Sequence, residues 1–145
     1  RYKATNGAVD LSEQSKLYLR NVGDNDRRIA EINTQLAVLD MVQRYVVSKN
    51  NDAGIVPSTL GIEDPVLSQL LQKLHDSEIR YQKLVKTTAE NNPVLIAVRD
   101  EMESIRPSIL ENINNQRSNL LASRTNLAST SSTYTTALQT IPQKE

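Results

Sequence analysis

Apolar residues recur every three or four positions through three long segments of the chain, and this spacing restricts the fold more than any other feature. In the first segment, six residues alternate between two heptad positions: Ile29, Ile32, Leu36, Leu39, Gln43 and Val46. Such a stripe is typical of helices that pack side by side as a coiled coil. Trp and Phe are absent and aromatic residues make up 3% of the chain, so there is little material for a thick globular core. The sequence predicts an all-α fold, an elongated antiparallel helical bundle or coiled-coil hairpin of about three long helices.

Capping and turn residues set the predicted helix boundaries. Asp10 with Glu13 three residues later forms a capping-box pattern. Asp64-Pro65 and Asn92-Pro93 each place a cap before a proline at the first helical position. We therefore expect one domain with these parts: the end of a preceding element at 1–9, helices at 10–49, 65–91 and 92–139, a linker at 50–64, and a following segment at 140–145.

Two residues interrupt the predicted helices without ending them. Gly23 costs about 1 kcal/mol relative to alanine in a helix interior, but Tyr18 and Val22 continue the apolar face before it. Pro107 removes one backbone donor, while Ile105 and Ile109 stay in phase on either side. We expect a bend at Gly23 and a kink near Pro107.

The second and third helices have stripes of their own. The second stripe consists of Leu67, Leu70, Leu74, Tyr81 and Leu84. The third consists of Val98, Met102, Ile105, Ile109, Ile113, Gln116, Leu120 and Leu127. The short break around Asn92 indicates a tight antiparallel hairpin between these two helices.

Composition excludes several classes of function. Lys plus Arg and Asp plus Glu are both 17 and neither forms a long run, which argues against a nucleic-acid partner. The absence of cysteine excludes disulfides, zinc–thiolate sites and a cysteine nucleophile. No apolar run approaches the roughly 20 residues that span a bilayer. Because the first residue is Arg1, we expect a piece of a longer protein whose membrane segments lie outside it.

The titratable residues do not form a catalytic, cofactor or metal site in the sequence. His75 is the one histidine, and we interpret it with Asp76 and Glu78 as a solvated helix face. A further charge cluster, interpreted as exposed ion pairs, consists of Arg99, Asp100, Glu101, Glu103 and Arg106. Tyr18, Tyr45 and Tyr81 lie on or beside apolar stripes, which favours packing.

Between Asn112 and Gln143 the charged side chains are Arg117 and Arg124, and Ser, Thr and Asn are abundant. One interpretation is a helix end of low propensity. The other is a surface for neighbouring chains or uncharged glycan, since hydroxyls and amides avoid the cost of desolvating charge. Because the first two helices are predicted to be too short to cover all of the third, we expect an oligomer interface at Leu120, Leu121, Leu127, Tyr134 and Leu138.

The order of three motifs resembles a known family. These motifs are Pro57-Ser58-Thr59-Leu60-Gly61-Ile62-Glu63-Asp64-Pro65-Val66-Leu67, then Asn91-Asn92-Pro93, then Ile141-Pro142-Gln143-Lys144-Glu145. Over nearly the whole chain this order is similar to the Wzz/Wzc-type polysaccharide co-polymerases, especially their Bacteroidetes forms. The structural positions matched are Asp64, Pro65, Asn92, Pro93, Ile141 and Pro142.

The resemblance implies an inner-membrane protein with an extracytoplasmic region between two membrane helices, and often a cytoplasmic tyrosine autokinase. It implies a periplasmic stalk without catalytic residues that assembles with copies of itself and with the polysaccharide polymerase and export machinery to regulate the chain length and export of capsular polysaccharide or exopolysaccharide. Two alternatives remain open: the hairpin of a periplasmic adaptor of an export system, and the regulatory helical region of a membrane kinase.

Overall fold

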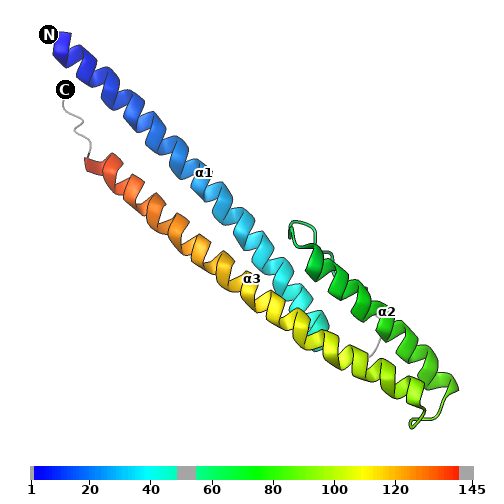
Figure 1. Cartoon of the computed structure of the whole chain (residues 1–145). Helices are drawn as coiled ribbons and strands as arrows, with labels where there is room; N and C mark the ends of the chain where they lie inside the picture. The colour runs from blue at the N-terminus through cyan, green and yellow to red at the C-terminus, as the bar shows by residue number, and fades with distance from the viewer. Residues whose placement is uncertain (1, 49–54, 141–145) are drawn as a thin grey trace. The chain divides into compact units, whose positions relative to one another are not determined.

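Three helices make up the computed structural model, which describes residues 2–48 and 55–140, with side chains from 12–48 and 55–139. They are α1 (Tyr2–Val47), α2 (Pro65–Thr87) and α3 (Pro93–Thr140) (Figure 1). No strand occurs in the described ranges. α1 and α2 each pack against α3, so the predicted all-α bundle is confirmed. None of the helices, over the described residues, is long and apolar enough to cross a membrane.

The chain divides into two compact units that share two helices, and the expectation of a single domain stays a prediction. Unit 1 comprises Arg1–Asn33 and Leu120–Glu145, and unit 2 comprises Thr34–Asn119. Both units contain part of α1 and part of α3, whereas α2 lies wholly in unit 2. A third helix is therefore available to unit 2 and not to unit 1.

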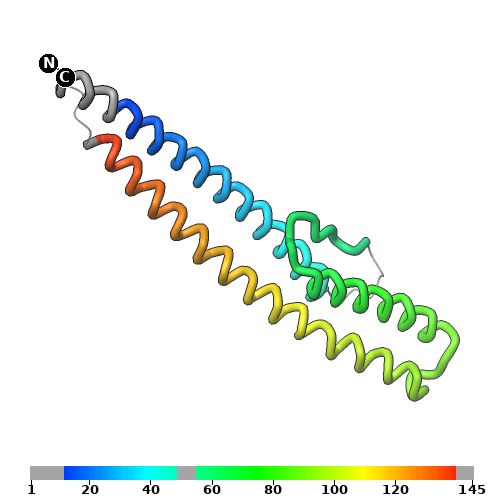
Figure 2. The backbone as a smooth tube through the Cα atoms, turned by 45° about the horizontal axis from the view of Figure 1, so that its top comes forward, coloured from blue at the N-terminus to red at the C-terminus, as the bar shows by residue number. Residues whose placement is uncertain are grey.

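Unit 2 is a three-helix bundle. α2 and α3 form an antiparallel hairpin, and the C-terminal part of α1 lies beside it in the same direction as α2 (Figures 1 and 2). The buried apolar side chains of unit 2 are Leu39, Val42, Val46, Leu67, Leu71, Leu74, Leu95, Val98, Met102, Ile105, Ile109 and Ile113. Each contributes roughly 1.5–3 kcal/mol when fully removed from water, so this core is the main source of stability in unit 2.

Both predicted helix starts with a cap and a proline are confirmed. Asp64 Oδ1 accepts hydrogen bonds from the backbone N–H groups of Val66 (2.9 Å) and Leu67 (3.2 Å) at the start of α2. Asn92 Oδ1 accepts from the Val94 N–H (2.9 Å) at the start of α3. In each case a side-chain oxygen satisfies donors that the first turn of a helix leaves without a partner.

The described part of the linker, residues 55–64, contains a tight turn that returns the chain to α1. The Ile62 N–H donates to the Thr59 carbonyl (3.0 Å), and Gly61 between them has a φ of +91°. Only glycine adopts such an angle readily at this turn position. The Gly61 carbonyl accepts a hydrogen bond from Gln35 Nε2 of α1 (2.9 Å), which fixes the turn beside the helix.

Two helix boundaries differ from prediction by four or more residues, and α1 also ends at Val47 rather than at residue 49. α1 begins at Tyr2 and not at Asp10, because the spacing of Asp10 and Glu13 also suits a helix interior and nothing before it prevents helical backbone. α2 ends at Thr87 and not at residue 91. The N–H and hydroxyl of Thr88 both donate to the Leu84 carbonyl, at 2.8 and 2.6 Å. This contact closes the helix before the reversal.

The predicted apolar stripes are confirmed on α3 and shifted on α2. Ile105 and Ile109 are both buried and α3 continues through Pro107, as their shared phase predicts; the kink stays a prediction. On α2 the predicted Leu67 and Leu74 are buried, but the leucine buried between them is Leu71, and the predicted Leu70 is half-buried. α2 faces two helices rather than one, so its buried face is wider than the predicted stripe.

Unit 1 is a pair of helices with little fully buried surface. The Tyr18 ring of α1 and the Tyr134 ring of α3 lie 5.5 Å apart between centroids, and Arg124 Nη1 donates to Asn33 Oδ1 (2.8 Å). α1 runs through Gly23, where an added Cβ would meet nothing within 4 Å. Among the described side chains of unit 1, the buried apolar residue is Ile32.

The antiparallel hairpin of unit 2 can be tested by crosslinking. Arg80 Nη1 of α2 lies 3.9 Å from Glu101 Oε2 of α3. Because the natural chain has no cysteine, Arg80→Cys with Glu101→Cys should join through a short bis-thiol reagent. The control pair Lys73→Cys with Glu101→Cys moves one site by two turns, about 10 Å, and should react much less. Equal yields from the two pairs, measured by peptide mass spectrometry, would contradict the hairpin.

Candidate functional site: a polar cluster across three helices

The core of unit 2 contains a cluster of polar side chains from all three helices, which we call the polar cluster: Tyr45 of α1, His75 and Glu78 of α2, and Arg106 of α3. The Tyr45 hydroxyl donates to Glu78 Oε2 (3.2 Å) and lies 3.4 Å from His75 Nδ1. Arg106 Nη2 lies 3.8 Å from Glu78 Oε1. The cluster therefore links α1 to both helices of the hairpin.

Glu78 is buried, with 6% of its surface exposed, so its interpretation as part of a solvated helix face is wrong. The heptad spacing from Leu67 and Leu71 through Leu74 to Glu78 places the carboxyl on the buried stripe of α2. That spacing was the signal in the sequence that could have identified it. Desolvation raises the pKa of Glu78 above its usual value, against the opposing effects of Tyr45, Arg106 and His75.

Tyr45 is half-buried beside this carboxyl. Burial, the charge of Glu78 and the hydrogen bond to Glu78 together raise the pKa of Tyr45 to about 12. The hydroxyl is thus held protonated, as a donor to Glu78. The prediction that Tyr18 and Tyr45 serve in packing agrees with their half-buried positions, but Tyr45 also has this polar role.

A second polar contact joins α3 to the start of α2. Asp64 Oδ2 accepts hydrogen bonds from Asn112 Nδ2 (3.1 Å) and Gln116 Nε2 (2.8 Å), while Oδ1 caps α2. Gln116 Nε2 also lies 2.6 Å from Asn112 Oδ1. The capping role of Asp64 was predictable from sequence. The contact with α3 was not, because it depends on the register of the hairpin.

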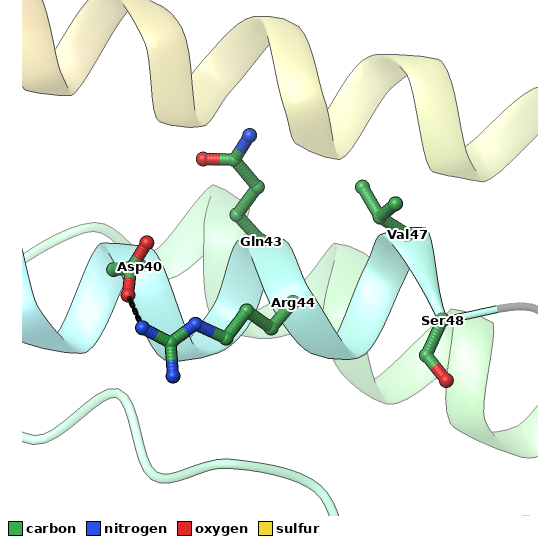
Figure 3. Close-up of a pocket in the computed structure, with 5 residues that line it drawn as sticks. All are labelled: Asp40, Gln43, Arg44, Val47 and Ser48. Atoms are coloured by element: carbon green, nitrogen blue, oxygen red, sulfur yellow. Dashed lines mark ion pairs between the residues drawn. The ribbon is translucent and has the colours of Figure 1, made fainter.

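The end of α1 borders an open surface pocket of about 350 Å³ in unit 2, lined by Asp40, Gln43, Arg44, Val47 and Ser48 (Figure 3). Gln43 and Val47 point toward α3 in this view, and the Gln43 amide oxygen accepts a hydrogen bond from Arg117. Arg44 pairs with Asp40 along α1. Asp40, Gln43 and Arg44 therefore each have a polar partner within the fold.

The predicted interface residues are not all on one exposed surface of unit 1. Leu120, Leu127, Tyr134 and Leu138 are half-buried at spacings that place them on the face where Tyr134 meets Tyr18. Leu121 is the exposed member, at 38%. The premise that α1 is too short to cover this part of α3 is wrong, because α1 starts at Tyr2. The interface itself stays a prediction.

The hydroxyl-rich segment of α3 bonds largely to its own helix. Five threonine hydroxyls donate to the carbonyl four residues earlier: Thr125, Thr130, Thr133, Thr135 and Thr136. These bonds satisfy the hydroxyl protons without a partner molecule. The oxygens keep lone pairs for further contacts, so both interpretations of this segment remain open.

Two members of the predicted charge cluster on α3 form ion pairs with α2. Glu101 pairs with Arg80 and Arg106 with Glu78, both across the hairpin. No group of three or more His, Asp or Glu residues in the described part of the chain could hold a metal ion. Ile141 and Pro142 of the third motif lie outside the described residues.

Asp64→Ala should destabilise unit 2 by about 1–2 kcal/mol through loss of the cap alone, and by more because Asn112 and Gln116 lose their acceptor. Asp64→Asn keeps a capping oxygen but replaces the second acceptor by a donor, so it should isolate the contact with α3. The exposed neighbour Glu63→Ala is the control. Urea unfolding followed by circular dichroism should rank the variants Ala, Asn, control, from least to most stable. Equal midpoints for all three would contradict the role of Asp64.

Tyr45→Phe should protect the protein against alkaline unfolding. The folded state holds the phenol proton more tightly than the unfolded chain, whose tyrosines titrate near about 10. The associated stability is complete below about pH 10 and is lost as pH rises toward the folded pKa of about 12. The urea midpoint of unfolding should therefore fall less between pH 9 and pH 11 for Tyr45→Phe than for the natural protein. Tyr81→Phe, outside the polar cluster, should behave as the natural protein does; an identical loss in all three would contradict the prediction.

The contacts described above all lie within the same chain. No protein-family model, no curated protein and no solved structure matches the chain.

Proposed function

We propose that this chain is an assembly module without catalytic residues, the periplasmic stalk of an inner-membrane protein that regulates the chain length and export of capsular polysaccharide or exopolysaccharide. In this role it contacts copies of itself and the polymerase and export machinery. Its side chains act by packing rather than by chemistry. The parent protein would carry the membrane helices, and a cytoplasmic tyrosine autokinase where the family has one.

The observation that carries the proposal is the contrast between the cores of the two units. Among the described side chains, unit 2 holds every buried apolar one except Ile32, which lies in unit 1. The stripe residues of unit 1 are only half-covered, and Leu17, Leu19 and Leu121 are 50%, 61% and 38% exposed. A pair of helices with so little core is weakly stabilised alone. A neighbouring helix that covered these side chains would supply the missing burial.

The outer surface of α3 in unit 1 suits contact between copies of the chain. Apart from Arg124, its residues from Leu120 to Gln139 are uncharged, so two such surfaces meet without like-charge repulsion and without desolvating ions. Arg124 itself is engaged with Asn33 of α1. These features favour self-association over a strongly charged partner.

The family resemblance supplies the finer part of the proposal. Two of its motifs, Asp64-Pro65 and Asn92-Pro93, stand at the starts of α2 and α3. A stalk built of helices needs such starts. Chain-length regulation, the periplasmic location and the partners come from the resemblance. They are proposals for this chain.

The test uses the full-length membrane protein in a polysaccharide-producing host. Leu127→Glu and Leu138→Glu would also damage the α1–α3 pair, so the informative change is at the exposed Leu121. Leu121→Glu should weaken the crosslinked oligomer and alter the length distribution of the surface polysaccharide. Ser123→Glu adds the same charge about 200° around the helix and should leave both unchanged.

Two outcomes would count against the proposal. Unchanged oligomer and polymer length for a normally expressed Leu121→Glu variant would remove this face as the interface. Unchanged polymer length after deletion of the whole region would remove the functional assignment.

A further inference from the structure

Glu78 occupies a position in unit 2 that an apolar residue would ordinarily fill. It lies one helical turn beyond Leu74 on the buried stripe of α2, and its side chain is 8% exposed. The side chains of α1 and α3 that reach it are Tyr45 and Arg106, and His75 approaches from its own helix. An ionised carboxylate in such a position is costly unless several donors surround it.

The donors around the ionised carboxylate are too few. A carboxylate has about four acceptor sites, but among the described residues Glu78 receives one hydrogen bond, from Tyr45 at 3.2 Å. Arg106 Nη2, at 3.8 Å, is beyond hydrogen-bond distance. Arg106 Nε is buried and has no hydrogen-bond partner among the described residues. Arg80, on the same helix as Glu78, pairs with Glu101 across the hairpin (3.9 Å).

A protonated Glu78 fits the same surroundings better. The neutral carboxyl loses the desolvation cost of the charge, and its new O–H group can donate to the Tyr45 oxygen. The Tyr45 hydroxyl then has His75 Nδ1, 3.4 Å away, as an acceptor when that nitrogen carries no proton. Arg106, whose side chain is 24% exposed, can turn its guanidinium toward water.

We propose that Tyr45 and Glu78 form a proton-controlled clasp that holds the C-terminal end of α1 on the α2–α3 hairpin more tightly once Glu78 has taken up a proton. Unit 2 then becomes more stable in mildly acidic solution, whereas most proteins lose stability as their carboxylates are protonated. This inference concerns unit 2 and does not depend on the proposed assembly role.

The direction follows from linkage. Burial raises the pKa of Glu78 above that of the unfolded chain, so the folded state binds the proton more strongly. The stabilisation is complete below the pKa of glutamate in the unfolded chain, roughly 4.3. It is lost as pH rises through the higher pKa of Glu78 in the folded state. Between pH 7.5 and pH 5, acidification should therefore strengthen the clasp.

The test compares urea unfolding of the full chain at pH 7.5 and pH 5. The natural protein should unfold at higher urea at pH 5 than at pH 7.5. Glu78→Gln is uncharged at both pH values, so it should be more stable than the natural protein at pH 7.5 and should lose the shift. Glu101→Gln removes a more exposed carboxylate of the same hairpin and should keep the shift. The comparison is repeated in a His75→Gln background, which removes the imidazole as a source of pH dependence.

Two further variants separate the clasp from ordinary packing. Arg106→Gln removes a charge that favours the ionised carboxylate, so it should enlarge the difference between the two pH values. Tyr45→Phe removes the hydroxyl that joins Glu78 to α1, so it should abolish the pH dependence of hydrogen exchange at the end of α1. A purely structural loss would lower the urea midpoint equally at both pH values. Hydrogen exchange at the amides of residues 42–47, corrected for intrinsic rates, should slow in step with protonation of Glu78.

The carboxyl carbon of Glu78 can be titrated directly by nuclear magnetic resonance in the folded protein, even if a variant fails to fold. A midpoint above that of the exposed Glu103 supports the clasp. A midpoint at or below that of Glu103 would overturn it, as would equal pH shifts for the natural protein and Glu78→Gln.

Discussion

The carboxylate of Asp64 is the contact on which the arrangement of unit 2 depends. One oxygen caps α2 through Val66 and Leu67, and the other accepts from Asn112 and Gln116 of α3. A single side chain therefore contacts both the start of α2 and the part of α3 that lies beside it. The α2 stripe can meet the α3 stripe only in that register, because a shift of one residue would turn each helix by about 100°.

The local sequence determined the helices, but not which of their charged side chains are buried. Asp64 and Asn92 have short-range capping patterns whose physics is complete within four residues, so their roles could be predicted. The start of α1 could not, because Asp10 and Glu13 fit both a helix start and a helix interior. The position of Glu78 depends on which face of α2 meets two other helices, and that is decided by contacts between residues more than 30 positions apart.

The polar cluster and the apolar core have different consequences for unit 2. Leu39, Val42 and Val46 attach α1 to the hairpin by burial, an effect that is nearly independent of pH and tolerant of small shifts. Tyr45 adds a directional contact to Glu78 within the last turn of α1. Burying a carboxyl there costs stability while it is ionised, yet it restricts the helices to the positions in which its partners can reach it. Specificity of packing is thus obtained at the expense of stability at neutral pH.

In unit 1, α1 and α3 pack without α2. The half-buried stripe of α1 includes Ser15 and Asn25, and that of α3 includes Ser131; these polar side chains add little apolar area to the contact. Local stability follows the density of buried apolar contacts, so we expect unit 1 to open more readily than unit 2. A surface with these properties gains more from an added helix than a sealed core does, since each half-covered leucine still has apolar area to bury. The physical conditions for association are therefore concentrated in unit 1, while unit 2 supplies the stable part of the fold.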